Sequence, residues 1–196
     1  MGRVPGMDAI SLLVGDHNRL RGLFTRFKSA EEKDDSETMK TLASKIFEQL
    51  EVHTKIEEQI FYPAVKDAGE EVSDLVDEGL EEHHVVDTLM GEAKSETEAG
   101  SDQWVAKLKV LIENVEHHAG EEEEDMFPPL RAKMASQLEE MAPKLEALKK
   151  KLGAPTSADT LELSKEQLTE LAQKQEIPGR STMSHEDLAL SVDPRG

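Results

Sequence analysis

The chain has 196 residues, of which 37% are hydrophobic and 4% aromatic, and its formal net charge is −19 at pH 7. This acidic excess argues against a nucleic-acid or anionic-membrane surface as its main function and suits a protein that handles cations. The absence of cysteine excludes disulfides and thiolate metal sites, and the absence of a membrane-length apolar run and of a signal-peptide pattern predicts a cytoplasmic protein.

Apolar residues recur at alternating steps of three and four, which is typical of amphipathic helices packed in a bundle. The predicted helices span, in chain order, about residues 8–30, 36–66, 71–97, 101–134 and 136–152. Asp8 is the expected N-cap of the first, and the fifth is expected to pack across one end. Because the connections are short, the predicted fold is all-α, an antiparallel up-down four-helix bundle with one extra helix.

The composition changes after the fifth helix. Residues 8–152 are predicted to form the bundle domain, and the Gly-, Pro-, Ser- and Thr-containing stretch 153–159 to be a linker. Residues 160–196 are too few to bury much of a core of their own, so a small helical segment is expected there.

Each of the four bundle helices carries a histidine on its apolar stripe, where a leucine or valine would be expected. A single histidine in such a place is more often a hydrogen-bonded core residue than a ligand. Four of them, one on each helix, meet in a common layer of the bundle, and burying them is costly unless they are paired or bind a metal. We therefore expect a shared metal site. The four are His17, His53, His83 and His118.

An internal repeat adds carboxylates to this set. Residues 51–63 read EVHTKIEEQIFYP, and residues 116–128 read EHHAGEEEEDMFP. The gapless alignment pairs His53 with His118, Glu57 with Glu122, Glu58 with Glu123 and Pro63 with Pro128. A histidine and a glutamate four residues apart share one helical face, so both can reach one metal or a bridged pair. Each proline is expected to kink or end its helix beyond the site.

Four histidines with Glu57 and Glu122 exceed what one tetrahedral zinc ion uses. Six ligands with glutamates placed to bridge suit two ions such as iron or manganese. The ferritin-like alternative needs Glu-x-x-His on two helices, and these histidines offer that spacing once, from Glu81 to His84.

Three choices stay open at this point. His83 is preferred to His84 as the third-helix ligand, because His83 lies on the apolar stripe and His84 on a mixed face. Glu58 and Glu123 either orient ligands or belong to a solvated face. Tyr62, the only tyrosine, is more often a packing residue at such a place than a ligand or a redox-active ring.

These residues resemble the hemerythrin-like, or HHE cation-binding, family over roughly residues 8–135. The matching motifs are Asp16-His17, His53-x-x-x-Glu57-Glu58 with Pro63, Glu82-His83, and His118-x-x-x-Glu122-Glu123 with Phe127-Pro128. The resemblance implies a non-haem centre of two iron ions, with manganese or zinc as alternatives, bridged by an oxygen and by the carboxylates of Glu57 and Glu122.

The third helix departs from the oxygen-carrying members of that family, which supply two histidines four residues apart there. Here Asp87 follows His83 at that spacing, and Thr88 follows His84. The resemblance therefore implies an open or differently filled position on one iron. Such a position favours oxygen or peroxide chemistry, nitric oxide binding or sensing over simple oxygen carriage.

Residues 163–188 resemble the N-terminal helix-loop-helix domain of transcription termination factor Rho, which is similar in shape to SAP motifs and is associated with nucleic-acid-binding proteins. Residues 159–196 contain four basic and eight acidic side chains. This balance disfavours a nucleic-acid partner and favours a small packing module or a dock for a protein partner.

Four functions follow from these patterns. The leading one is a di-iron protein that binds oxygen, nitric oxide or peroxide, without membrane association. The second is a di-iron enzyme that decomposes peroxide or reduces nitric oxide, and the sequence does not separate an enzyme from a binding protein. The third is a regulator that passes the state of the iron to a partner through residues 160–196. The fourth is a mononuclear metal hydrolase.

Overall fold

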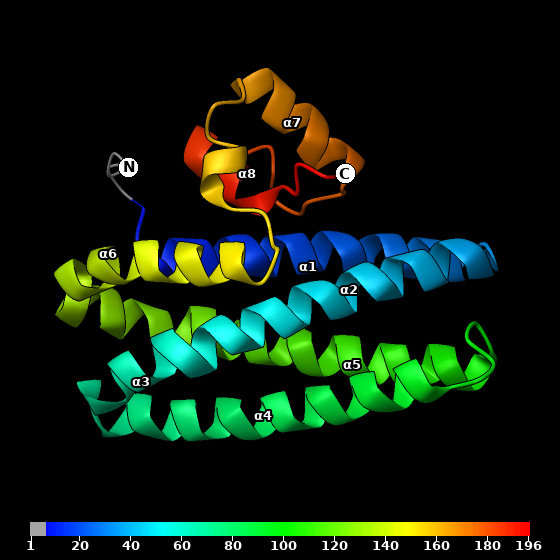
Figure 1. The fold of residues 1–196 in the computed structure, drawn as a ribbon, viewed down its shortest axis with the longest axis horizontal. Helices are drawn as coiled ribbons and strands as arrows, with labels where there is room; N and C mark the ends of the chain where they lie inside the picture. The colour runs from blue at the N-terminus through cyan, green and yellow to red at the C-terminus, as the bar shows by residue number, and fades with distance from the viewer. Residues whose placement is uncertain (1–6) are drawn as a thin grey trace.

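The structure, a computed structural model, describes residues 7–196, and none of these residues forms a strand. The elements are α1 (Ala9–Glu31), α2 (Ser36–Ile56), η1 (Glu57–Phe61), α3 (Tyr62–Val65), η2 (Lys66–Ala68), α4 (Glu70–Ser95), α5 (Asp102–Glu121), η3 (Glu122–Met126), α6 (Phe127–Lys151), η4 (Ser157–Asp159), α7 (Lys165–Lys174) and α8 (His185–Ser191). The four long helices α1, α2, α4 and α5 lie along one direction and alternate in sense (Figure 1). The predicted all-α up-down bundle is confirmed. No helix of the described part is long and apolar enough to cross a membrane.

The helices begin where local chemistry satisfies their first amide groups. Asp8 caps α1, as predicted, with its carboxylate accepting from the Ser11 amide at 2.6 Å. Asp35 caps α2 in the same way, through the Thr38 amide at 3.1 Å. Such caps satisfy amide groups that have no partner within the helix, so they fix where each helix starts.

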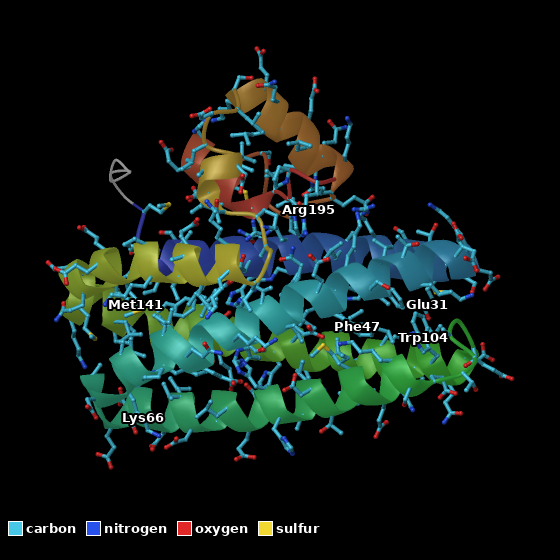
Figure 2. All side chains as sticks on the ribbon, viewed as in Figure 1. Glu31, Phe47, Lys66, Trp104, Met141 and Arg195 are labelled. Carbon is cyan, nitrogen blue, oxygen red and sulfur yellow. The ribbon has the colours of Figure 1, made fainter. Side chains whose placement is uncertain are left out.

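The bundle core consists of two hydrophobic clusters. One contains Ile10, Leu13, Phe61 and Met141, and the other contains Trp104 with residues from the far halves of α1, α2, α4 and α5. Figure 2 labels Met141 and Trp104 toward opposite ends of the bundle. On α1 and α4 the predicted histidine falls between residues of the two clusters, and on α2 and α5 it follows the last residue of the second cluster. A polar layer therefore interrupts an otherwise apolar core.

The fifth predicted helix differs in its position. It is the second half of α6, which continues from the first half across a kink at Met134, where φ is −130° and ψ is 24°. This half runs alongside the N-terminal half of α1 (Figure 1), and it buries Leu138 and Leu145 in the same cluster as Ile10. The expectation that it packs across one end of the bundle is wrong, because its apolar stripe covers the flank of α1.

The C-terminal segment (160–196) packs on the outer side of α1 through α8 and the loop after α7 (Figure 1). A Cβ atom added at Gly15 would lie 2.7 Å from the Leu190 carbonyl oxygen, and one at Gly22 would lie 2.5 Å from the Gln175 carbonyl oxygen. Glycine in α1 thus allows the two backbones to approach closely. The segment also has a small core of its own, so the expectation that it buries little needs correction. The division into 8–152, 153–159 and 160–196 stays a prediction.

Candidate metal centre

The structure brings all six predicted ligand residues together in the polar layer. His17, His53, His83 and His118 come from the middles of α1 and α4 and the ends of α2 and α5, and all four are buried. Glu57 and Glu122 follow one turn later in the two repeats, and they are 0% and 2% exposed. His83 lies in the layer, whereas its neighbour His84 is exposed.

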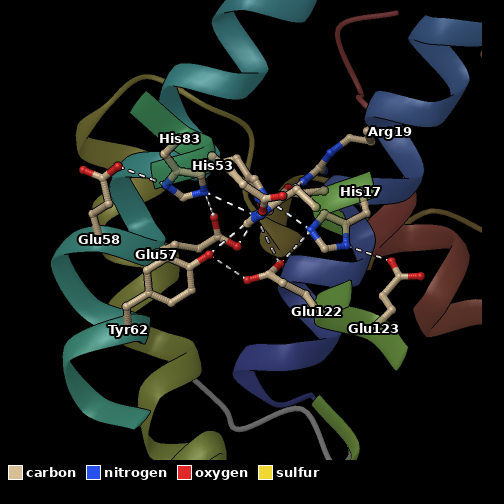
Figure 3. A network of polar contacts seen from close by, with 12 residues as sticks. His17, Arg19, His53, Glu57, Glu58, Tyr62, His83, Glu122 and Glu123 are labelled. Carbon is tan, nitrogen blue, oxygen red and sulfur yellow. Dashed lines mark hydrogen bonds and ion pairs between the residues drawn. The ribbon is translucent and has the colours of Figure 1, made fainter. Parts of the chain in front are cut away.

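The four histidines form two pairs whose Nε2 atoms face each other. Figure 3 labels three of them, His17, His53 and His83. The distance between the Nε2 atoms is 3.1 Å for His17 and His53, and 3.3 Å for His83 and His118. Glu57 spans the two pairs, because its Oε1 lies 3.2 Å from His53 Nε2 and its Oε2 lies 3.3 Å from His83 Nε2.

Glu122 spans the pairs from the other repeat. Its Oε2 lies 3.3 Å from His17 Nε2 and 3.8 Å from His118 Nε2. Ligand atoms of His17, His53, Glu57 and Glu122 all lie within 4.8 Å of one another, and so do those of Glu57, His83 and His118. The residues therefore form two adjoining ligand groups that share Glu57.

Outer carboxylates hold three of these histidines with Nε2 facing inward. His17 Nδ1 lies 2.8 Å from Glu123, His83 Nδ1 lies 3.0 Å from Glu58, and His118 Nδ1 lies 2.7 Å from Glu82. A carboxylate on one imidazole nitrogen fixes the tautomer and leaves the other nitrogen free for a metal. The alternative in which Glu58 and Glu123 orient ligands agrees with this geometry.

The outer carboxylates follow a rule that is visible in the sequence. Glu58, Glu82 and Glu123 each adjoin a predicted ligand along the chain, yet each contacts a histidine of a different helix. Sequence reasoning gave Glu82 no role beyond its place in a motif. The signal that identifies it is an acidic residue directly beside a ligand.

The prolines of the repeat do not end their helices. Instead, π-helical segments η1 and η3 begin at Glu57 and Glu122, and the Tyr62 and Phe127 amides donate to the carbonyl groups of these glutamates. The helices then continue with proline in their first turn, where its missing N–H costs little. The expectation that the helices end there is therefore wrong, and the expected kink stays a prediction. The feature observed at these positions is a π-bulge, which is frequent at functional sites.

Tyr62 lies inside the site. Its hydroxyl donates to Glu122 Oε1 at 2.9 Å, and its ring stacks on His83 at 5.6 Å between centroids. Gly79 of α4 makes room, since a Cβ atom there would lie 2.9 Å from the Tyr62 hydroxyl oxygen and 3.3 Å from a ring carbon of His118. Tyr62 therefore contacts two of the predicted ligands, Glu122 and His83, in addition to packing.

The electrostatics of the layer separate the two glutamates. Burial, and then the charge of Glu122, raises the pKa of Glu57 well above its ordinary range. Burial would also raise the pKa of Glu122, but the neighbouring His118, His17 and His53 lower it instead. Burial lowers the pKa of His53 to about 4, so this imidazole is neutral near pH 7.

The residues fit a bound cation. Both oxygens of Glu57 and Oε2 of Glu122 are buried without a hydrogen-bond partner in the part of the chain that is described. A buried carboxylate with no donor is unfavourable unless a cation compensates it. Inward-facing imidazole nitrogens and spanning carboxylates are the donors that iron, manganese and zinc accept.

His53 has a different outer neighbour. Its Nδ1 lies 3.7 Å from Asp16 Oδ2, longer than a hydrogen bond. Asp16 Oδ1 accepts from Lys149 at 2.6 Å and also contacts Arg19, which in turn reaches the Val192 carbonyl of the C-terminal segment at 3.4 Å. Burial would raise the pKa of Asp16, but Lys149 and Arg19 hold it well below its usual range. Sequence reasoning did not find this cluster.

Comparison with known proteins gives a family match and two kinds of relative. A family model described as the Hemerythrin HHE cation binding domain matches residues 8–130. Two mycobacterial proteins are 31% identical over 146 residues, which cover 72% of this chain and 84% of theirs: Uncharacterized protein Rv2633c of Mycobacterium tuberculosis (strain ATCC 25618 / H37Rv) and Uncharacterized protein Mb2666c of Mycobacterium bovis (strain ATCC BAA-935 / AF2122/97).

A DNA nickase of Nostoc sp. (strain PCC 7120 / SAG 25.82 / UTEX 2576) is 26% identical over 140 residues, which cover 70% of this chain and 38% of the nickase. The chain therefore spans well under half of that relative. No solved structure matches the chain. The resemblance of residues 163–188 to the Rho domain receives no support, since the family match ends at residue 130.

Proposed function

Since the chain belongs to the family of hemerythrin HHE cation-binding domains, we propose that it is a non-haem di-iron protein that reacts with oxygen, nitric oxide or peroxide. One iron would be held by His17 and His53 and the other by His83 and His118. Glu57 and Glu122 would span both ions.

The observation that carries this proposal is the position of Glu57. It is fully buried, its two oxygens face histidines of different pairs, and neither oxygen has a hydrogen-bond partner in the described structure. A single bound ion would use only one side of this carboxylate. Two ions, one at each histidine pair, use both oxygens and account for all six residues.

The side chains around the two histidine pairs would position the ligands and exclude water. Bound iron supplies electron transfer and a position for a small ligand. The outer carboxylates Glu58, Glu82 and Glu123 hold three imidazoles in place, and the apolar clusters on either side of the layer keep bulk water out. These residues therefore define a rigid, dry site for a small molecule.

A second candidate function, enzymatic decomposition of peroxide or reduction of nitric oxide, is favoured by Tyr62. Nitric oxide reduction consumes protons and peroxide decomposition transfers them between oxygen atoms, and the Tyr62 hydroxyl, whose oxygen lies 2.9 Å from Glu122 Oε1, carries a proton inside the layer. The third-helix position where oxygen carriers have another histidine is taken by Asp87 or Thr88, and both are exposed. The ligand set on this side is therefore short of one imidazole, and Tyr62 is the polar group that lies there.

The C-terminal segment is proposed as a packing module of this chain, because its helix α8 lies against α1. Its four basic and eight acidic residues over 159–196 support no nucleic-acid role. We do not propose a DNA-cleaving activity for this chain, since the region it shares with the nickase is only 38% of that protein.

The test is metal content by mass spectrometry together with the visible spectrum of aerobically purified protein. We expect about two irons per chain and oxo-bridged charge-transfer absorption near the ultraviolet edge. His83→Ala should lower the iron content, and His84→Ala, one residue away and exposed, should not. One zinc per chain without colour would overturn the proposal in favour of a mononuclear hydrolase. Peroxide turnover by the iron protein then separates the enzyme from a binding protein.

A further inference from the structure

A cavity of about 220 Å³ lies between α1, α2 and the C-terminal segment, and none of the proposed metal ligands lines it. Figure 2 labels Arg195 at its rim, where the C-terminal segment meets the bundle. Four basic residues line it, in a chain with a net charge of −19: Arg19, Arg26, Lys45 and Arg195. A cavity lined by four basic residues is unusual in a chain with this excess of acidic residues.

The two acidic residues of the cavity are already paired. Glu48 lies 2.6 Å from one nitrogen of Arg195, and Asp193 lies 2.8 Å from another. These contacts, with Asp193 first, raise the pKa of Arg195. Glu48 and Asp193 therefore both pair with Arg195, and neither forms an ion pair with Arg19, Arg26 or Lys45 in the described structure.

The other three basic residues have unused donors. Arg26 has no hydrogen bond or ion pair with any residue that the structure describes. Lys45 contacts only the backbone oxygen of Gly196. Arg19 is 7% exposed, and its Nε is buried without a partner in the described structure, while its other nitrogens contact Asp16 and the Val192 carbonyl. A buried guanidinium N–H without an acceptor is unfavourable.

We propose that this cavity binds a small phosphorylated anion. Guanidinium groups match phosphate oxygens with paired donors, and a lysine adds a point charge. The basic groups approach from two helices of the bundle, α1 and α2. A tetrahedral phosphate presents oxygens in several directions, whereas a carboxylate presents two in one plane. The volume exceeds the roughly 30 Å³ that one water occupies severalfold, so it accommodates a phosphate with a small organic group.

The test is isothermal titration calorimetry of the full chain at constant ionic strength. The probes are inorganic phosphate and glycerol 3-phosphate, with succinate as a dicarboxylate of equal charge. Arg26→Gln and Lys45→Gln are the cavity variants, since Arg26 has no partner among the described residues and Lys45 contacts only the Gly196 oxygen. Lys33→Gln is the matched control, because Lys33 is an exposed lysine outside the cavity and its loss changes the net charge equally.

We expect saturable binding of both phosphates and weaker binding of succinate. Each cavity variant should weaken phosphate binding roughly tenfold or more, as the loss of a charged hydrogen bond does, and Lys33→Gln should change it less than twofold. Absence of saturable phosphate binding overturns the proposal. So does equal weakening by the control, which indicates nonspecific attraction, or succinate binding as tight as that of glycerol 3-phosphate, which excludes the phosphate class. Circular dichroism of each variant shows whether it is folded. The proposal does not depend on the identity of the metal.

Discussion

Replacing Glu57 by glutamine separates what this buried carboxylate costs the fold from what it contributes to metal binding. Both carboxylate oxygens of Glu57 are buried and lack a hydrogen-bond partner in the described structure. A buried polar group without a partner costs about 1–3 kcal/mol. Glutamine keeps the size but cannot ionise, so it removes the cost of either burying a charge beside Glu122 or keeping the carboxyl group protonated. We therefore expect metal-free Glu57→Gln to be more stable than the wild type by about 1–3 kcal/mol, or about 2–4 °C in Tm per kcal/mol for a chain of this length.

The pH dependence of the metal-free protein has a definite sign. Burial and the charge of Glu122 raise the pKa of Glu57 in the folded state above its unfolded value. The stability that this group contributes is therefore fully present below the ordinary glutamate pKa and is lost as the pH rises through the raised value. The advantage of Glu57→Gln should grow over that window, and it should be smallest in acid.

With iron bound, we expect the wild type to be more stable than Glu57→Gln. A ligand at 100 times its Kd stabilises the folded state by about 2.7 kcal/mol, and a neutral amide oxygen cannot span two cations as a carboxylate does. The variant should therefore gain much less from ferrous iron than the wild type. Calorimetric unfolding of both proteins under anaerobic conditions, with and without ferrous iron, measures the four stabilities.

Glu146→Gln is the matched control. Glu146 is also buried, but both of its oxygens accept from the Ser157 amide at 3.1 Å. Its replacement should lower the stability of the metal-free protein and leave the gain from iron unchanged. A Glu57→Gln variant that is less stable than the wild type without metal, or that gains as much from iron, would refute the reasoning.

Three further substitutions test the site and its surroundings. His53→Ala should lose iron, because it removes an imidazole of one pair, and exposed His84→Ala should keep it; both are read by mass spectrometry. Gly79→Ala should lower iron content and Tm, since its Cβ would lie 2.9 Å from the buried Tyr62 hydroxyl oxygen. Gly91→Ala, with no atom within 4 Å, should instead stabilise the fold by the roughly 1 kcal/mol of helix propensity and so raise Tm. Gly22→Ala should weaken the packing of the C-terminal segment, because the new Cβ would lie 2.5 Å from the Gln175 carbonyl oxygen. Limited proteolysis should then remove the segment faster, and unchanged cleavage would contradict the packing described.

The sequence predicts the bundle well because an apolar period fixes both the helices and their register. α1 was expected over about 8–30 and occupies Ala9–Glu31, and the histidines fall in one layer because each interrupts a stripe at the same depth. The sequence does not predict that an acidic residue beside one ligand contacts a histidine of another helix. Glu82 beside His83 reads as an exposed acid, and only the packing of α4 against α5 turns it toward His118.

The features that the sequence does not predict depend on which elements pack against each other, and the apolar periodicity of a helix does not specify its neighbour. Gly15 and Gly22 read as weak points of a helix, since glycine is a poor helix former. Their role appears only when Leu190 and Gln175 lie against them. Likewise, the second half of α6 has an apolar stripe but no signal for its neighbour, and burial of Leu145 and Lys149 assigns it to the flank of α1.

The metal layer and the C-terminal segment are connected by a short polar path. Asp16 faces His53 Nδ1 at 3.7 Å and also contacts Arg19, which reaches the Val192 carbonyl and lines the basic cavity. A cation at His53 Nε2 makes the Nδ1–H a stronger donor, which favours a shorter contact with Asp16. An anion on Arg19 competes with Asp16 for the same guanidinium. Binding at the two places is therefore linked, and linkage is reciprocal: iron should change the affinity for phosphate by the same factor by which phosphate changes the affinity for iron. Equal phosphate affinities of the metal-free and iron-loaded chains would mean that this path transmits nothing.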